Sequence, residues 1–255
     1  MKILLVGNSF SVDVSTYVHQ IALSAGKDID IYVLYIGGCP INLHYQNLQT
    51  EEKAYEFYKN GSREPLMWCS LQEGLAYEDW DFITFQQRSS DSGDENTFFP
   101  ELPLLMDGIR KYSKGKYILH MTWSYAKSHS HDKYGSNPLN QKQMDEDIFL
   151  AYEKVSERLG IPYVIPTGKA IQEARKVFGD NLTRDGYHLN EMGRTLSGYL
   201  WCYYFLGTNI GLSNFRPSGY SYDDVTKPVQ TKDLKALRDI AKKVIINNKR
   251  GNLNG

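Results

Sequence analysis

The stretch Ile3-Leu4-Leu5-Val6-Gly7-Asn8-Ser9 opens the chain with four apolar residues that run straight into a glycine and two polar residues. A short apolar run that ends at a turn signal is typical of a buried β-strand. We predict a strand over 2–6 and a helix over about 14–25, which Gly26 would end. A strand followed closely by a helix is the first half of a βαβ unit, so this stretch favours an α/β fold.

The same alternation of short strands and longer helices continues to about residue 206. It predicts strands over 29–35, 82–85, 117–122 and 163–166, and helices over 100–112, 144–159, 169–178 and 191–206. Such units form a parallel sheet with helices on both faces. The predicted fold is therefore α/β, a three-layer α/β/α, flavodoxin-like arrangement around a five-stranded parallel sheet. Segment 42–78 has no clean period, so we expect irregular structure there, with a short helix and hairpin-like pieces.

No linker, internal repeat or low-complexity tract divides the 255 residues, and this length suffices to bury a sizeable core. We therefore predict one domain over residues 1–208. Residues 209–255 are expected to form a C-terminal extension packed on the same domain. The basic stretch from Lys235 to Arg250 carries its apolar residues at helical spacing, which predicts a terminal helix with a solvated basic face.

The composition argues against several classes of protein. A net charge of −1 offers no broad electrostatic surface for nucleic acid or for an anionic membrane. The three cysteines form no C-x-x-C pair, so neither a disulfide framework nor a zinc site is expected. The first apolar run is too short for a signal peptide, and the later ones fall far below the ~20 residues that span a bilayer. We expect a soluble, cytoplasmic protein, with the mature form of an exported protein as the alternative.

Candidate catalytic residues lie at two distant places in the chain. Ser9 follows the first strand, and Asp185-Gly186-Tyr187-His188 directly precedes the predicted helix over 191–206. A serine hydroxyl is a poor nucleophile that needs a base to remove its proton, and a carboxylate usually holds that base in the right tautomer. One tight turn could bring Asp185 to His188. The alternative is that these polar residues merely cap the helices that follow them.

Two further loops end at the same edge of the predicted sheet, because the carboxyl ends of parallel strands meet there. Gly37-Gly38 follows the second strand and could offer a backbone N–H to an oxyanion, since no side chain blocks close approach. Gln86-Gln87 follows the third strand and offers amide donors. A simple turn and a polar strand end are the corresponding alternatives.

Taken in this order, the four blocks resemble those of the SGNH (GDSL-type) hydrolase superfamily over roughly residues 1–207. That family carries a serine after the first strand, a glycine after the second, an amide side chain after the third, and Asp-x-x-His near the C-terminus. The resemblance implies that Ser9 is the nucleophile and that His188 is the general base and then the general acid. It also implies that Asp185 orients His188.

The chain departs from the family pattern in two places. Asn8 stands where an acidic residue usually precedes the serine, which gives a Gly-Asn-Ser form of the first block. The third block has glutamine in place of asparagine, and Phe85-Gln86-Gln87 looks like the glutamine variant of carbohydrate O-acetylesterases in the superfamily. Glutamine keeps the N–H₂ donor, so by resemblance Gln87, or else Gln86, would complete an oxyanion hole. The other donors would be the N–H of Ser9 and that of Gly37 or Gly38.

The loop over 123–137 is expected to form a rim of the substrate cleft, because its polar and aromatic side chains suit a sugar. Asn8, Trp123 and Tyr125 are the residues predicted to line that cleft. His129 and His131 lack carboxylate or cysteine partners at ligand spacing, so we expect no metal site.

The expected function is that of a carboxylic ester hydrolase, a serine esterase acting on short-chain acyl esters, above all acetyl esters on carbohydrate. Its partner would be a small-molecule or carbohydrate ester, and the mechanism needs no cofactor. The resemblance leaves the acyl chain length, the alcohol and the oligomeric state open. One alternative is a non-catalytic carbohydrate-binding module on the same scaffold. Another is a phosphate or nucleotide binder, although Gly7-Asn8-Ser9-Phe10 lacks the glycine spacing and lysine of a P-loop.

Overall fold

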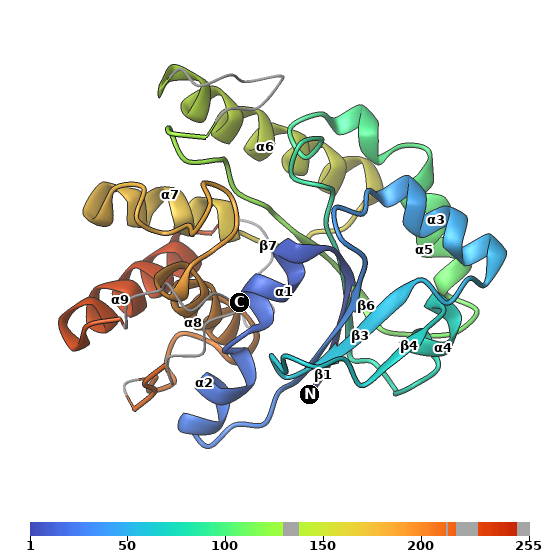
Figure 1. Cartoon of the computed structure of the whole chain (residues 1–255), viewed down its shortest axis with the longest axis horizontal. Coiled ribbons are helices and arrows are strands. Elements are labelled where there is room, and N and C mark those ends of the chain that lie inside the picture. Colours follow the sequence, from blue (N-terminus) through green and yellow to red (C-terminus); the bar gives the residue numbers. More distant parts are fainter. Residues whose placement is uncertain (130–137, 213, 218–228, 249–255) are drawn as a thin grey trace.

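The computed structural model describes residues 1–129, 138–212, 214–217 and 229–248. Within these residues, seven strands form one sheet (Figure 1). The strands are β1 (Lys2–Gly7), β2 (Asp30–Tyr35), β3 (Tyr55–Lys59), β4 (Met67–Cys69), β5 (Phe82–Phe85), β6 (Lys116–His120) and β7 (Val164–Ile165). Their order across the sheet is β4-β3-β2-β1-β5-β6-β7, which places β1 at its centre.

The five strands predicted from the sequence form the parallel part of this sheet. β1 pairs in parallel with β2 and β5, β5 with β6, and β6 with β7. In chain order this is the 2-1-3-4-5 arrangement of flavodoxin-like folds, so the predicted fold class is confirmed. Four successive residues of β1, Ile3–Val6, are buried, as expected for a strand covered on both faces.

The sheet has seven strands rather than the predicted five, because the segment over 42–78, for which irregular structure was predicted, contributes β3 and β4. β3 pairs antiparallel with β2, and β4 pairs antiparallel with β3. Tyr55 and Phe57 of β3 are buried, whereas Glu56 between them is only half-buried. This alternation was too short to stand out beside Gly61 and the neighbouring polar residues. The resulting hairpin extends the sheet on the β2 side.

Helices cover both faces of the sheet. They are α1 (Ser9–Ser15), α2 (Val18–Ser24), α3 (Ile41–Thr50), α4 (Leu71–Leu75), α5 (Glu101–Ile109), α6 (Pro138–Leu159), α7 (Thr167–Phe178), α8 (Glu191–Leu206) and α9 (Thr231–Asn247), with a 3₁₀ turn η1 (Glu95–Phe98). Figure 1 shows α1, α2, α7, α8 and α9 on one side, and α3, α4, α5 and α6 on the other. The arrangement is the three-layer α/β/α structure that the sequence predicts.

The first helix differs from its prediction. Instead of one helix over about 14–25, α1 begins at Ser9 and a break separates it from α2. The hydroxyls of Ser15 and Thr16 both donate to the carbonyl of Val12, at 3.1 and 3.0 Å, so side chains compete with the backbone where the helix breaks. Because α1 starts early, Ser9 lies in its first turn.

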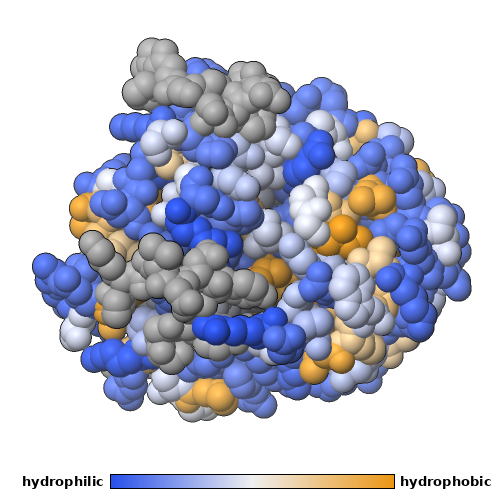
Figure 2. Space-filling view, in the orientation of Figure 1, coloured by the Kyte–Doolittle hydropathy of each residue, from blue (hydrophilic) through white to orange (hydrophobic). Residues whose placement is uncertain are grey.

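The terminal helix predicted for the extension is present as α9, which packs against α7 and α8. Leu237, Ala241 and Ile245 form its buried stripe. None of the helices in the described ranges is long and apolar enough to cross a membrane. Figure 2 shows one face of the molecule, on which hydrophilic residues predominate and hydrophobic ones gather in small groups.

Candidate active site

Ser9, His188 and Asp185 form a continuous chain of hydrogen bonds, although Ser9 and His188 are 179 positions apart in the sequence. The Oγ of Ser9 lies 2.8 Å from Nε2 of His188. Nδ1 of His188 lies 2.6 Å from Oδ2 of Asp185. The two ring nitrogens therefore face different partners, a hydroxyl on one side and a carboxylate on the other. This is the arrangement of nucleophile, base and orienting acid.

His188 and Asp185 lie on a short hairpin over residues 182–190, which we call the 182–190 hairpin. Its two arms are joined by hydrogen bonds from the N–H of Arg184 to the carbonyl of His188 (2.9 Å) and from the N–H of Asn190 to the carbonyl of Leu182 (3.0 Å). At the tip, Gly186 has a φ of +97°, a conformation that favours glycine. The turn thus folds Asp185 back onto His188.

The carboxylate of Asp185 is held by three N–H groups of its own turn. Its Oδ1 accepts hydrogen bonds from the backbone N–H groups of Tyr187 (3.1 Å) and His188 (2.8 Å), while Oδ2 faces the imidazole. Partial burial raises the pKa of Asp185, but the hydrogen bonds from His188 and Tyr187 outweigh it and hold that pKa below its usual value. An ionised Asp185 favours the proton on Nδ1 of His188, which leaves Nε2 to accept the proton of Ser9.

The hydroxyl of Ser9 is not used to cap α1, because another residue does so. Oδ1 of Asn8 accepts the N–H of Phe10 at 3.1 Å, so Asn8 is the cap and the hydroxyl of Ser9 is left to His188. Asn8 is also tied to the second loop, where its Nδ2 donates to the carbonyl of Cys39 at 3.1 Å. Asn8, rather than Ser9, is therefore the N-cap of α1.

An open pocket of about 480 Å³ lies over the Ser9–His188 pair at the carboxyl edge of the sheet. It is lined by residues from five loops: Asn8 and Ser9; Tyr35, Gly37 and Gly38; Arg88, Ser89 and Ser90; Tyr125 and His129; Tyr187 and His188. Both glycines predicted for the site are in this lining. Gly38 has a φ of +61°, so glycine suits the turn that follows β2.

Of the residues predicted to line the cleft, Tyr125 reaches it and Asn8 touches it from a buried position, but Trp123 does not. Trp123 is fully buried and stacks on Phe10, with ring centroids 3.9 Å apart. Its Nε1 donates to the carbonyl of Tyr187 at 2.7 Å. The prediction for Trp123 is therefore wrong, because its ring is buried against Phe10 and does not line the pocket. His131 and the rest of 130–137 lie outside the described residues.

The predicted contribution of Gln86 to an oxyanion hole is also wrong. Gln86 is buried, and its Nε2 donates to Oδ1 of Asn8 at 2.6 Å. Its Oε1 lies 2.8 Å from the Ser11 hydroxyl, which donates to it, and 2.8 Å from Nδ1 of His120. Gln86 is thus part of a buried network beneath Ser9, formed by Asn8, Ser11, Gln86 and His120, which we call the sub-site network, and it does not line the pocket.

Gln87, the preferred candidate, is buried as well and points away from the pocket. Its Nε2 donates to the backbone carbonyl of Thr97 at 2.7 Å. Its Oε1 accepts the N–H groups of Ile41 (3.0 Å) and Arg88 (2.8 Å). Gln87 therefore joins α3 to the loop after β5, and the prediction that it donates to an oxyanion is corrected. The reason is that the glutamine side chain at this strand end is hydrogen-bonded to buried backbone groups instead of facing the pocket.

Several pocket residues were not identified from the sequence. Arg88, Ser89 and Ser90 directly follow the glutamines, so their place after a predicted strand was an available signal. The Arg88 guanidinium lies 2.8 Å from the carboxylate of Asp91, and the Ser89 hydroxyl lies 2.9 Å from that of Tyr125. Tyr35 and Tyr187 add aromatic rings. Tyr187 lies inside Asp-x-x-His itself, which could have marked it.

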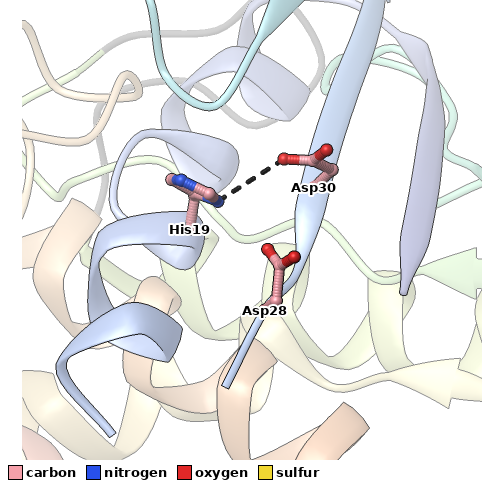
Figure 3. A group of neighbouring side chains, drawn as sticks. All are labelled: His19, Asp28 and Asp30. Atoms are coloured by element: carbon pink, nitrogen blue, oxygen red, sulfur yellow. Dashed lines mark ion pairs between the residues drawn. The ribbon is translucent and has the colours of Figure 1, made fainter. Parts of the chain in front are cut away.

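One group of histidine and acidic side chains in the described ranges is close enough to hold a cation: His19, Asp28 and Asp30 (Figure 3). Asp30 begins β2, so this group lies at the opposite edge of the sheet from Ser9. Asp30 already pairs with Lys59 at 3.1 Å and accepts Nδ2 of Asn60 at 2.7 Å. These contacts satisfy the carboxylate without a metal ion, and the group plays no part in the pocket.

Comparisons with known proteins agree with this architecture. The model of a family described as a domain of unknown function, DUF4886, matches residues 2–230. A DUF4886 family protein from Bacteroides uniformis ATCC 8492 has a similar crystal structure, with a TM-score of 0.84 and 32% sequence identity. The match covers 100% of this chain and 98% of that one. No curated protein matches the sequence.

More distant solved structures show the same fold. The lipase/acylhydrolase from Enterococcus faecalis has a TM-score of 0.51 at 16% identity, covering 82% of this chain and 97% of that one. A member of the lipolytic protein G-D-S-L family from Veillonella parvula DSM 2008 has a TM-score of 0.50 at 13% identity, covering 78% and 94%. The chain therefore has the fold of SGNH/GDSL-type hydrolases.

Proposed function

Because the chain belongs to the DUF4886 family and has the fold of GDSL-type acylhydrolases, we propose that it is a serine esterase. Its proposed substrates are short-chain acyl esters, chiefly acetyl esters carried on carbohydrate. The observation that carries the proposal is the hydrogen-bonded chain from Ser9 through His188 to Asp185, which opens into a pocket.

The geometry supports a two-step acyl transfer. Ser9 Oγ attacks the ester carbonyl while Nε2 of His188 takes the hydroxyl proton, and Asp185 stabilises the imidazolium that forms. His188 then gives this proton to the leaving alcohol, which departs and leaves an acyl group on Ser9. In the second step, His188 activates a water molecule, whose attack releases the acid and restores the serine hydroxyl.

The oxyanion of each tetrahedral intermediate needs hydrogen-bond donors near Ser9. We assign this role to the backbone N–H of Ser9, in the first turn of α1, together with the N–H of Gly37 or Gly38. Both glycines line the pocket beside Ser9. With both glutamine amides engaged elsewhere, backbone groups take the part that an amide side chain plays in the related family.

A sugar-bound ester fits the composition of the pocket. Tyr35, Tyr125 and Tyr187 offer aromatic area that ends in a polar hydroxyl, which suits the alternating apolar and polar surface of a sugar ring. Among the lining residues that the structure describes, Arg88 is the single arginine, and it is paired with Asp91, so this part of the lining presents little net charge. This balance favours a neutral ester over a strongly anionic one.

The test is release of 4-nitrophenol from its acetate and butyrate esters by the parent protein and by Ser9→Ala and His188→Ala. We expect both variants to lose at least about three orders of magnitude in kcat, the scale for members of a catalytic triad. Ser15→Ala and His19→Ala serve as matched controls, because Ser15 lies on the same helix and His19 at the other edge of the sheet.

Equal, slow rates in all five proteins would contradict an esterase mechanism. Binding of an acetylated sugar that survives Ser9→Ala, with no turnover by the parent protein, would then favour the non-catalytic carbohydrate-binding module. A preference for acetate over butyrate would support a short acyl chain.

A further inference from the structure

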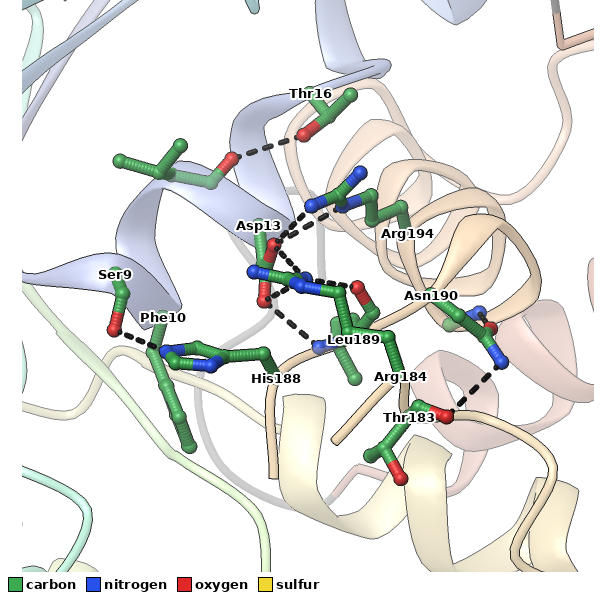
Figure 4. A network of polar contacts seen from close by, with 12 residues as sticks. Ser9, Phe10, Asp13, Thr16, Thr183, Arg184, His188, Leu189, Asn190 and Arg194 are labelled. Atoms are coloured by element: carbon green, nitrogen blue, oxygen red, sulfur yellow. Dashed lines mark hydrogen bonds and ion pairs between the residues drawn. The ribbon is translucent and has the colours of Figure 1, made fainter. Parts of the chain in front are cut away.

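The helix that carries the nucleophile also carries a buried carboxylate one turn later. Ser9 and Asp13 are four residues apart on α1, so their side chains leave the same face of the helix. Two adjacent residues of the 182–190 hairpin meet this face: His188 contacts Ser9, and Leu189 contacts Asp13 (Figure 4). The hairpin is thus docked on α1 at two successive points, of which only the first belongs to the proposed chemistry.

Asp13 holds both arms of the hairpin. Its Oδ2 accepts the backbone N–H of Leu189 at 2.7 Å, directly after His188. Its two oxygens lie 2.9 and 3.2 Å from Nη1 of Arg184, directly before Asp185. The same Nη1 donates to the carbonyl of Leu189, so Arg184 closes the hairpin across its two arms. The turn that presents Asp185 and His188 is therefore clamped on either side by one carboxylate.

The clamp is anchored from behind by α8. Nε and Nη2 of Arg194 donate to Oδ1 of Asp13 at 3.0 and 2.9 Å. Arg194 also faces Glu191 at 3.7 Å, and Glu191 accepts the hydroxyl of Tyr17. Asp13 and Arg194 are each only 1% exposed. Removing the charge of Asp13 would leave the buried Arg194 without this partner, which is costly in free energy. The buried charges therefore favour this one arrangement of side chains.

We propose that Asp13 is a positioning residue that sets the distance between Ser9 and His188 by docking the 182–190 hairpin on α1. The inference rests on the proposed serine chemistry. Asp13 does not touch the reacting atoms; its action passes through Leu189 and Arg184 to the turn between them. A misplacement of about 1 Å in such a site can cost about 10²-fold in rate, so a carboxylate outside the triad can control turnover.

The test compares Asp13→Asn with Glu191→Gln. Both changes replace a buried carboxylate of the same network by its amide, but the carboxylate of Glu191 contacts Tyr17 and Arg194 rather than the hairpin. Three quantities are measured at a temperature where each variant is folded by circular dichroism. They are kcat and KM on 4-nitrophenyl acetate, the rate at which a fluorophosphonate labels Ser9, and the proton NMR signal of the Nδ1–H of His188.

We expect Asp13→Asn to lower kcat and the labelling rate by about 10²-fold with KM unchanged, and to broaden or abolish the Nδ1–H signal. Glu191→Gln is expected to lose thermal stability yet keep both rates within about threefold and retain the signal. Parent-like labelling and an intact signal in Asp13→Asn would overturn the proposal. Equal losses in both variants would also overturn it, because they would reflect general destabilisation.

If Asp13→Asn does not fold, Arg184→Met carries the same test, because Arg184 is partly exposed and methionine keeps an unbranched apolar stem while removing Nη1, the nitrogen that reaches Asp13 and Leu189. The same loss of labelling with unchanged KM is expected, and parent-like labelling would overturn the proposal. Failure of the proposed function is recognised separately. In that case the parent and Ser9→Ala label equally, and the Nδ1–H signal still reports whether Asp13 positions His188.

Discussion

The 182–190 hairpin contacts Ser9 itself, whereas the sub-site network holds its neighbours Asn8 and Ser11. The two use similar kinds of side chain for different purposes. The hairpin brings His188 to the pocket and holds Asp185 next to it, where the side chain of Asp185 is 40% exposed. The sub-site network brings a glutamine and a histidine together beneath Ser9, where Gln86 and His120 are 1% and 0% exposed. The comparison teaches that the exposure of a side chain, more than its residue type, distinguishes the residues proposed to react from those that hold the structure at this edge of the sheet.

Burial also determines the protonation state of His120 in the sub-site network. It lowers the pKa of His120 to about 3, so the imidazole is neutral at ordinary pH and its Nδ1 is available to donate to Gln86. Such a histidine holds its neighbours in place and takes no part in proton transfer near neutral pH. Asp185, by contrast, stays ionised through its hydrogen bonds and supports a histidine that faces the pocket.

The largest expected effect is a loss of kcat on changing Asp185, in the 182–190 hairpin. Asp185→Asn should lower kcat by about 10⁴-fold, the scale known for the orienting aspartate of serine proteases, because an amide no longer selects the Nδ1–H tautomer. The melting temperature should change little, since this side chain is partly exposed. Steady-state kinetics with thermal melts measure both effects. A loss of less than tenfold would remove Asp185 from the mechanism.

On the inner side, Gln86→Leu should cost stability rather than rate. Asn8, Ser11 and His120 would each lose a buried partner, and we expect a loss of about 3 kcal/mol in the free energy of unfolding, measured in urea. The kcat of the folded protein should stay within about tenfold. Gln143→Leu, an exposed change on α6, is the control and should stay within about 0.5 kcal/mol.

The opposite result for Gln86→Leu would break the comparison. A loss of about 10³-fold in kcat with nearly unchanged stability would return Gln86 to the role of oxyanion donor that the sequence suggested.

The smallest effect, counted per histidine and per pH unit, is a pH dependence of stability. Burial lowers the pKa values of His44 and His120 to about 3, from about 6.5 in the unfolded chain. Below pH 6.5 the unfolded chain therefore binds protons that the folded protein does not. The stabilisation is complete above pH 6.5, and each histidine should lose about 1.4 kcal/mol per pH unit as the pH falls toward about 3.

Urea unfolding at pH 7, 6 and 5 measures this slope, and His120→Gln should flatten it by about one histidine's share. Parallel slopes for the parent and variant would mean that His120 gains its proton in the folded state, contrary to its place in the sub-site network.

Much of the architecture could be predicted because it depends on local patterns. The five parallel strands and most of the helices follow from apolar periodicity, and the order of the loops then placed Ser9, Asp185 and His188 at one edge of the sheet. Their proximity is seen in the structure, while their chemical roles stay a prediction. The hairpin of β3 and β4 and the break between α1 and α2 depend on tertiary packing and on hydroxyl side chains, which periodicity does not register.

The glutamines show why side-chain direction could not be predicted. Gln86 and Gln87 end a strand at the expected edge, but each has long-range partners, Asn8 and His120 for the first and Thr97 and Ile41 for the second. Nothing local distinguishes an amide that faces a pocket from one that joins two loops. Asp13 left a weak signal, as a carboxylate between two valines one turn after Ser9, but Arg184 and Arg194 are too distant in sequence to connect with it.

The docking of the hairpin on α1 has a consequence for how this chain can change in evolution. Asp13 lies near one end of the chain, while Arg184 and Arg194 lie more than 170 positions away, and all three share one buried carboxylate. If two relatives differ at these positions, a recombination crossover between residues 13 and 184 would combine Asp13 of one with arginine positions of the other. We therefore expect these three residues to vary together, although they lie in widely separated parts of the sequence.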